Sequence, residues 1–283
     1  MDLPLFPLHS VLCPGVALPL HIFEERYRVM IDHCIERGEP FGVVLIRDGS
    51  EVGRMPGRLA DVGTTALIRR AGRYPDGQLD IVTVGGQRFR LSSVDSTTQP
   101  YLVGSVTLLD ESLGDDGAVT ALGVSVGRRF LRYLELLQPA LAATGGPDIE
   151  IEVEIEAPDD TADDVPAEPG VRLAAIDASQ ADDGDEAEDP TLDTSGLSEA
   201  QRRDLLMTAA RRLIATDDPT ALSYLLTGLI QLDSSTRQDL LEAPDTYGRL
   251  LGLDALLVRE VRYLLRHLRP INLDPAESAL RRN

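Results

Sequence analysis

The spacing of hydrophobic residues changes several times along this chain, and each change predicts a different kind of element. Residues 3–22 are almost wholly apolar and contain four prolines, which indicates two short strands separated by a proline-shaped turn. From Phe23 to Ile35 apolar residues recur at helical spacing with Gly38 just beyond them, and this predicts an amphipathic helix of about four turns. The apolar run FGVVLI at 41–46 then predicts a buried strand.

Between residues 63 and 111 the hydrophobic period shortens to two, which is typical of strands. Four strands are expected, in the segments TTALIRRA, QLDIVTV, QRFRLSSV and YLVGSVTLL, with turns at YPDG (74–77) and VGG (84–86). In QRFRLSS the apolar residues alternate with arginines. The pattern therefore predicts an antiparallel sheet with one solvated face, curled toward a barrel.

The helical period returns in the rest of the chain, except for one tract of unusual composition. The predicted helices lie at 117–138, ended by Pro139; at 198–215; from the N-cap Asp218 with Pro219 at the first helical position; at 233–242; and from Asp245 to Pro270. Between Asp148 and Asp193 there are 18 acidic residues and one arginine. Such a tract cannot bury enough apolar surface to offset its ordering entropy, so we expect disorder over 157–195.

These patterns predict an α+β chain in which a β-rich subdomain precedes a helical bundle. The expected parts are a β-rich subdomain at 1–112, a bridging helix at 117–138, an acidic low-complexity insertion at 140–196, a helical bundle at 197–270 and a tail at 271–283. The formal charge of −20 belongs almost entirely to the insertion, because the remainder has 29 acidic residues against 26 arginines. The insertion has three interpretations: a solvating spacer, a bait for basic partners, or a tail that competes for an arginine face.

All 27 basic residues are arginines, because the sequence contains no lysine. This excludes a P-loop, Schiff-base chemistry and a Ser-Lys dyad within these 283 residues. Arginine does not replace lysine as a base, because its guanidinium has too high a pKa to lose its proton. The acidic balance disfavours nucleic acid and anionic membranes as partners. Two cysteines, no basic leader before a cleavage site and no apolar run of about 18 residues favour a reduced, cytoplasmic protein.

Two candidate reaction centres near the N-terminus fail on spacing. His9, Cys13 and His21 are zinc-ligand types, but their intervals fit no ligand pair on a turn or helix, so neither a metal nor a cofactor is expected. Ser10 follows His9 directly, and adjacent residues on a strand point to opposite faces. The GxSxG pattern occurs as GVSVG at 123–127, but it lies inside the helix predicted at 117–138 and forms no turn between a strand and a helix, so we expect no catalytic residues.

Three separated segments resemble the N-terminal substrate-binding domain of Lon proteases, in the form that bacteria also make as a free-standing protein. They are LPLFPLHSVLCPGVALPLHIFEERYRVMI, ADVGTTALIRRAGRYPDGQLDIVTVGGQRFRL and DDPTALSYLLTGLIQLDSSTRQDLLEAPDTYGRLLGLDALLVREV, in that order. The resemblance implies a PUA-like, barrel-like subdomain followed by a helical bundle. It also implies recognition of unfolded or tagged substrates, with the chemistry done by ATPase and peptidase domains that these residues do not include.

The resulting hypothesis is a non-enzymatic module that binds extended polypeptide segments or a partner protein. The candidate contact residues are Leu18, Ile22, Phe23 and Phe89. The alternative is an RNA-binding protein of PUA-like fold that uses one arginine-rich sheet face, formed by Arg69, Arg70, Arg73, Arg88 and Arg90. The sequence does not specify the client or the oligomeric state.

Overall fold

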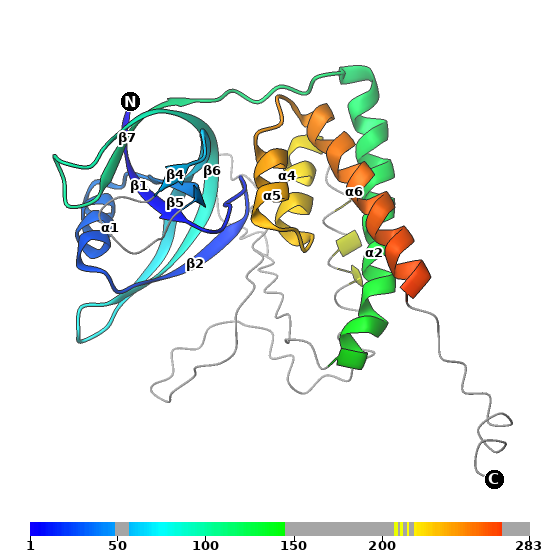
Figure 1. Ribbon diagram of the computed structural model, residues 1–283, viewed down its shortest axis with the longest axis horizontal. Coiled ribbons are helices and arrows are strands. Elements are labelled where there is room, and N and C mark those ends of the chain that lie inside the picture. Colours follow the sequence, from blue (N-terminus) through cyan, green and yellow to red (C-terminus); the bar gives the residue numbers. More distant parts are fainter. Residues whose placement is uncertain (49–56, 145–206, 209, 212–213, 215–217, 268–283) are drawn as a thin grey trace, which may run out of the picture.

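The computed structural model describes residues 1–48, 57–144, 207–208, 210–211, 214 and 218–267 (Figure 1). They form two parts side by side: a sheet lobe, which contains the strands between Asp2 and Leu108, and a helical lobe, which contains the helices that follow from Asp116. The predicted disorder at 157–195 and tail at 271–283 lie outside the described residues, as does most of the helix expected at 198–215. No helix among the residues described is both long and apolar enough to cross a lipid bilayer.

Seven strands build the sheet lobe. They are β1 (Asp2–Leu8), β2 (Ala17–Ile22), β3 (Phe41–Asp48), β4 (Arg58–Leu59), β5 (Val62–Arg73), β6 (Leu79–Asp95) and β7 (Leu102–Leu108). The pairing order is β1-β7-β6-β5-β3-β4, with β2 added to β6, and all of these pairs are antiparallel. In addition, β1 pairs in parallel with β3, so the strand order closes back on its first strand. The sheet thus wraps around an apolar interior (Figure 1).

The turn expected at VGG does not exist, because β6 runs unbroken through it for 17 residues. A Cβ atom on Gly85 would lie 2.1 Å from the carbonyl oxygen of Cys13, where the backbone after β1 crosses the strand. Two backbone hydrogen bonds hold this crossing, from Gly15 N to Gly85 O at 2.8 Å and from Gly85 N to Val16 O at 2.9 Å. Glycine here permits a close backbone approach inside a strand and makes no turn. The turn at YPDG is confirmed, with Gly77 at a φ of 86°.

Helix α1 (Glu25–Arg37) closes one side of the sheet lobe (Figure 1). Its buried face inserts Tyr27, Met30, Ile31 and Cys34 into the sheet core, as the helical spacing predicts. Gly38 ends the helix in the left-handed conformation at φ 64°, which suits a residue without a Cβ atom. Phe23 and Ile35, expected on the same apolar stripe, are instead 59% and 44% exposed.

Four described helices make up most of the helical lobe. They are α2 (Asp116–Thr144), α4 (Pro219–Leu229), α5 (Ser234–Leu241) and α6 (Thr246–His267). Asp218 caps α4 by accepting a hydrogen bond from Thr220 N at 2.8 Å, as predicted. The predicted end of α2 at Pro139 is wrong, since the helix continues to Thr144. Proline removes one backbone hydrogen bond from a helix, and a helix can contain it when the turns on either side keep their own hydrogen bonds.

Helices α2 and α6 lie against each other and run in the same direction (Figure 1). A Cβ on Gly123 would lie 4.0 Å from Leu250, and six residues further on Arg129 pairs with Asp254 at 2.7 Å. Their facing residues share one hydrophobic core with α4. The C-terminal ends of both helices therefore lie at the same end of the lobe.

Candidate functional site

An exposed group of aromatic rings forms where β2 ends beside the β5–β6 hairpin. The His21 ring lies between Phe23, with ring centroids 6.2 Å apart, and Tyr74, with centroids 6.1 Å apart. Phe23 and Tyr74 remain 59% and 48% exposed. We call these three residues the aromatic platform. Their proximity arises from strand pairing, which aligns His21 on β2 with Asp80 on β6.

Hydrogen bonds fix the imidazole at the centre of the aromatic platform. Its Nδ1 lies 2.6 Å from an Asp80 carboxylate oxygen, and its Nε2 lies 2.6 Å from the Gln78 side-chain oxygen. The Tyr74 hydroxyl donates to the other oxygen of Asp80. The hydrogen bond to Asp80 raises the pKa of His21, against a smaller opposing effect of burial. Because both ring nitrogens face oxygen acceptors, the doubly protonated ring satisfies this environment best.

The pKa of the Asp80 carboxyl group, which binds the central imidazole, shifts in the opposite direction. Partial burial raises the pKa of Asp80, but the hydrogen bonds from Tyr74 and His21 outweigh that effect and lower it overall. The same hydrogen bond to the carboxylate raises the pKa of the Tyr74 phenol. The group therefore combines a carboxylate, a neutral phenol and a readily protonated imidazole.

The hairpin that carries Tyr74 is attached to α1 by two polar contacts. Arg73 pairs with Asp32, and Arg28 donates a hydrogen bond of 3.5 Å to the carbonyl oxygen of Asp76. These contacts hold the tip of the hairpin against the helix that follows Phe23. The aromatic platform is thus supported from both sides, although its rings face solvent.

The chemistry of the aromatic platform suits binding. Aromatic rings with one open face offer apolar area at a small conformational cost, and such residues are enriched where proteins bind other proteins. His21 makes hydrogen bonds to a carboxylate and an amide, so the imidazole is not paired with a hydroxyl or thiol nucleophile through these contacts. The arrangement presents two aromatic rings to solvent beside an imidazole that is held by hydrogen bonds.

The four contact residues expected from the sequence separate in the structure. Ile22 is 1% exposed and Phe89 is fully buried, so both have packing roles and neither reaches a ligand in this conformation. Leu18 is partly buried and packs on the sheet core. Phe23 alone of the four is well exposed. Periodicity distinguishes apolar positions but not which of them a strand turns outward, and it did not indicate Tyr74, whose place in a turn was the available signal.

The arginine face expected for RNA binding is not continuous. Arg88 is 3% exposed because its side chain lies in the junction between the lobes, where residues of the helical lobe cover it. Its guanidinium pairs with Glu111 at 2.8 Å and donates to the carbonyl oxygens of Leu241 and Ala243 at 2.7 and 2.8 Å. Arg73 is paired with Asp32, while Arg69, Arg70 and Arg90 are exposed. The spacing of these arginines predicted one wet face, whereas Arg88 joins the two lobes.

The same junction contains a second buried guanidinium, which the sequence analysis did not identify. Arg249 is fully buried; it donates to Tyr224 Oη at 2.7 Å and to Ser223 Oγ at 2.9 Å, and its Cζ lies 3.7 Å from the Tyr224 ring centroid. Tyr224 in turn donates to Glu111 at 2.7 Å. Burial raises the pKa of the Tyr224 phenol, which therefore stays protonated as a donor. Because each polar group is matched, the network fixes the relative position of the lobes.

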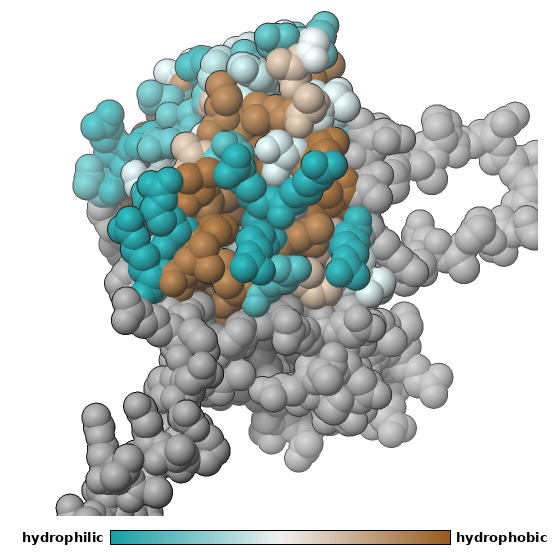
Figure 2. All heavy atoms as spheres, turned by 90° about the vertical axis from the view of Figure 1, so that its right-hand side faces the viewer, coloured by the Kyte–Doolittle hydropathy of each residue, from teal (hydrophilic) through white to brown (hydrophobic). Residues whose placement is uncertain are grey.

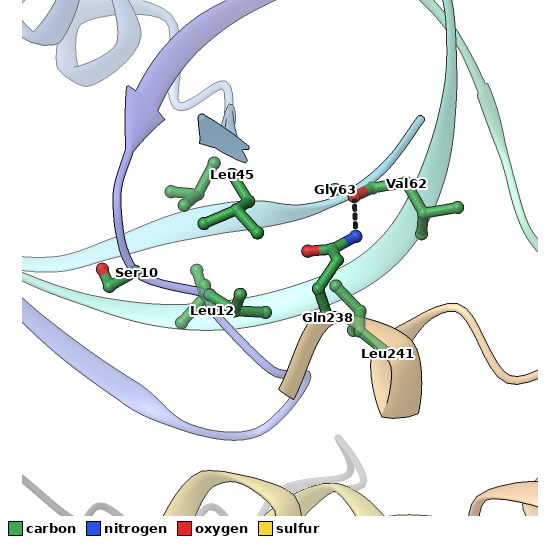
Figure 3. A pocket seen from close by; sticks show the side chains of 9 residues that line it. Ser10, Leu12, Leu45, Val62, Gly63, Gln238 and Leu241 are labelled. Atoms are coloured by element: carbon green, nitrogen blue, oxygen red, sulfur yellow. Dashed lines mark hydrogen bonds between the residues drawn. The ribbon is translucent and has the colours of Figure 1, made fainter. Parts of the chain in front are cut away.

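A small hollow at the lobe junction provides no room for a ligand (Figure 3). About 140 Å³ of space between atoms lies in and above this hollow, part of it open to solvent, and none of it is wide enough for a water molecule. Its walls are mainly apolar, and Gln238 spans it by donating to Val62 O at 2.9 Å. Ser10 lies at its edge among apolar neighbours. The hollow is a packing contact between α5 and the sheet.

The metal-ligand candidates do not assemble into a site. Cys13 is buried at the lobe junction, and burial raises its thiol pKa to about 12. His21 is bound to Asp80, and the carbonyl oxygen of His9 accepts a hydrogen bond from Ser234 at 2.7 Å. Within the described ranges, no three His, Cys, Asp or Glu side chains are grouped so that they could hold a metal ion.

Comparison with known proteins identifies one family over most of the chain. The family model for the ATP-dependent protease La (LON) substrate-binding domain matches residues 2–259. The Lon protease of Porphyromonas gingivalis is 31% identical over 140 residues, which are 48% of this chain and 16% of that protein. The Lon protease of Parabacteroides distasonis is 33% identical over 117 residues, 40% of this chain and 14% of that protein. The matched region is thus a small part of either relative.

Two solved structures are similar to this one over nearly its full length. The N-terminal domain of a Mycobacterium avium complex Lon protease aligns with a TM-score of 0.51 and 18% identity, covering 93% of this chain and 98% of that one. A Lon N-terminal domain protein from Xanthomonas campestris aligns with a TM-score of 0.47 and 22% identity, covering 90% and 98%. The first of these similarities supports the fold of a sheet followed by helices.

Proposed function

This chain belongs to the family of ATP-dependent protease La (LON) substrate-binding domains, and we propose that it binds extended segments of other polypeptides through the aromatic platform. The family match supports a substrate-binding module. The relatives with that name are much longer proteins, so their proteolytic activity is not transferred to these residues. The proposal concerns binding alone.

One observation carries this proposal: Phe23 and Tyr74 expose about half of their surfaces, and the Tyr74 hydroxyl is held by the Asp80 carboxylate. His21 lies between the two rings and is held by Asp80 and Gln78 at 2.6 Å. Exposed aromatic side chains have few rotatable bonds and so lose little entropy when they take up an apolar side chain of a ligand. Of the four residues expected from the sequence, only Phe23 belongs to the proposed surface, because Leu18 points to the opposite face of β2 from His21 and packs on the sheet core.

We propose further that binding involves no reaction within these residues. The family match is to a substrate-binding domain and includes neither an ATPase nor a peptidase domain. RNA binding is the less favoured function, because Arg88 is committed to the lobe junction. The PUA-like character of the sheet lobe, the subdomain limits 1–112 and 197–270, and a cytoplasmic location remain predictions.

Substitution at the aromatic platform tests the proposed site. The probe is fluorescein-labelled lactalbumin, reduced and carboxymethylated so that it stays unfolded, and its anisotropy is measured as the full chain is added. Phe23→Ala and Tyr74→Ala should each weaken binding about 5- to 30-fold, since a central aromatic anchor contributes about 1–2 kcal/mol. Native lactalbumin should bind weakly to every version.

Tyr263→Ala provides the matched control, because Tyr263 is an exposed aromatic residue on α6 with 56% of its surface accessible. Its Kd should stay within about twofold of the unsubstituted chain, as expected for a residue outside an interface. Equal losses for Phe23→Ala and Tyr263→Ala would contradict a specific surface on the sheet lobe. RNA capture that disappears in high salt would favour the alternative function instead.

A further inference from the structure

The C-terminal halves of α2 and α6 carry an excess of arginine. Residues 128–137 and 254–266 contain six arginines and three carboxylates. The ion pairs are Arg129 with Asp254 at 2.7 Å, Arg132 with Glu135 at 2.9 Å and Arg259 with Glu260 at 3.1 Å. The other three arginines, Arg128, Arg262 and Arg266, are exposed and have no carboxylate within ion-pair distance in the described part of the chain. We call these three residues the arginine face.

The arginine face is assembled by the parallel arrangement of the two helices. Arg128 lies four residues before Arg132 on α2, and Arg262 lies four residues before Arg266 on α6, so each pair follows one side of its helix. Apolar side chains stand among them, including Leu265 at 53% exposure. Figure 2 faces this side of the lobe and shows long hydrophilic side chains between hydrophobic ones. A ligand for this surface would combine negative charge with apolar groups.

We infer that the arginine face is occupied by the acidic tract of the same chain, residues 148–193. The tract has 18 acidic residues and one arginine, so its charge is complementary to the face. Within it, residues 149–156 alternate glutamate with isoleucine or valine, which matches a surface of arginines and apolar side chains. The inference does not depend on the aromatic platform, which lies on the other lobe.

The connection to α2 is long enough for this contact. Twelve residues separate Arg132 from Thr144, where α2 ends, and at 1.5 Å per residue they span about 18 Å. An extended chain covers about 3.3–3.6 Å per residue, so roughly six residues beyond Thr144 return over that distance. The connection to residues 149–156 is therefore long enough for them to reach Arg132 and, beyond it, Arg128.

A spin label in the tract tests the contact directly in the full chain. Both native cysteines are buried, with thiol pKa values raised by burial to about 12 for Cys13 and about 11 for Cys34, so an Ala157→Cys variant can be labelled at one position. Paramagnetic broadening of backbone amide signals in 128–137 and 259–266 is the expected result in 50 mM salt. Broadening should decrease severalfold in 500 mM salt, because salt screens exposed charges.

Two triple variants of the labelled chain separate docking from simple tethering. Arg128→Gln, Arg262→Gln and Arg266→Gln together should reduce the broadening severalfold, whereas Arg58→Gln, Arg69→Gln and Arg90→Gln, exposed positions on the sheet lobe, should leave it unchanged. Equal broadening in both triple variants overturns the inference. Labelled chain mixed with isotope-enriched unlabelled chain must give no broadening, because transfer between molecules would identify a second copy as the occupant. Unchanged circular dichroism verifies that each variant is folded.

Discussion

At the scale of single residues, the same side-chain type has opposite roles according to where the backbone places it. Arg88 and Arg90 are two positions apart on β6, yet Arg88 is 3% exposed with three hydrogen-bonded partners and Arg90 lies in solvent. His21 has a side chain that often binds metals, but here it is the centre of an aromatic group, because its partner Asp80 comes from a strand 59 residues away. Residue type alone decides neither role.

The pairing of His21 with Asp80 should be visible as a displaced titration. In Asp80→Asn the pKa of His21 should fall toward its ordinary value of 6.5, because the hydrogen bond to the carboxylate is the largest cause of its elevation. The measurement is the pH dependence of the His21 imidazole signals by NMR. A titration that does not move would mean that the pair is absent in solution.

The directions of the two pKa shifts determine how the His21–Asp80 pair changes stability with pH. His21 has a raised pKa when folded, so its contribution is complete below the unfolded value of 6.5 and is lost as pH rises through the folded value. Asp80 has a lowered pKa, so its contribution is present above 3.8 and is lost as pH falls through the folded value. The pair therefore stabilises the fold most between these two limits, by a small amount since both side chains are about half exposed.

At the scale of elements, β6 decides the shape of the sheet lobe. Its first part pairs with β2 and β5, and its second part pairs with β5 and β7. This double use requires one long strand that passes beneath the segment between β1 and β2. Of the two glycines that suggested a turn, Gly85 is the position where that segment contacts the strand, whereas Gly86 lies against Thr65 of β5.

Gly85→Ala should therefore destabilise the protein, although alanine usually suits a strand no worse than glycine. A methyl group 2.1 Å from the Cys13 carbonyl oxygen forces the crossing segment away, at a cost of about 1–3 kcal/mol. Urea denaturation gives the free energy of unfolding. Gly72→Ala is the matched control in the same sheet, where the nearest atom would be 3.9 Å away, and its stability should change by less than about 0.5 kcal/mol. Equal stabilities for the two variants would show that the crossing segment can move away from β6 without a loss of stability.

At the scale of the whole molecule, the two lobes form one unit because buried charge joins them. Glu111 follows the last strand and binds Arg88 from β6 and Tyr224 from α4. Gln238 on α5 donates to Val62 at the start of β5. The aromatic platform and the arginine face thus lie on separate lobes whose relative position is held by this network, so the two proposed surfaces can be occupied at the same time.

Arg88→Met should weaken the connection between the lobes. The substitution leaves the carbonyl oxygens of Leu241 and Ala243 without their donor, at a cost of about 1–3 kcal/mol for each buried acceptor, while Glu111 keeps the Tyr224 hydroxyl as a donor. Hydrogen exchange followed by mass spectrometry should show faster exchange in peptides from both lobes. Arg90→Met on the same strand should change stability by less than about 0.5 kcal/mol. Similar behaviour of the two variants would show that the lobes are held by apolar contacts alone.

The sequence by itself determined most of the elements, because helical periods, caps and turns act over a few residues, but it misplaced the end of α2 and divided β6 into two strands. Asp218, Gly38 and the YPDG turn have the predicted roles, and the order of strands before helices is confirmed. Only the tertiary structure decided which side chains meet. The burial of Phe89 and Arg88, the continuity of β6 and the group around His21 all depend on pairings between segments far apart in the chain, and local spacing does not contain the energies of those contacts.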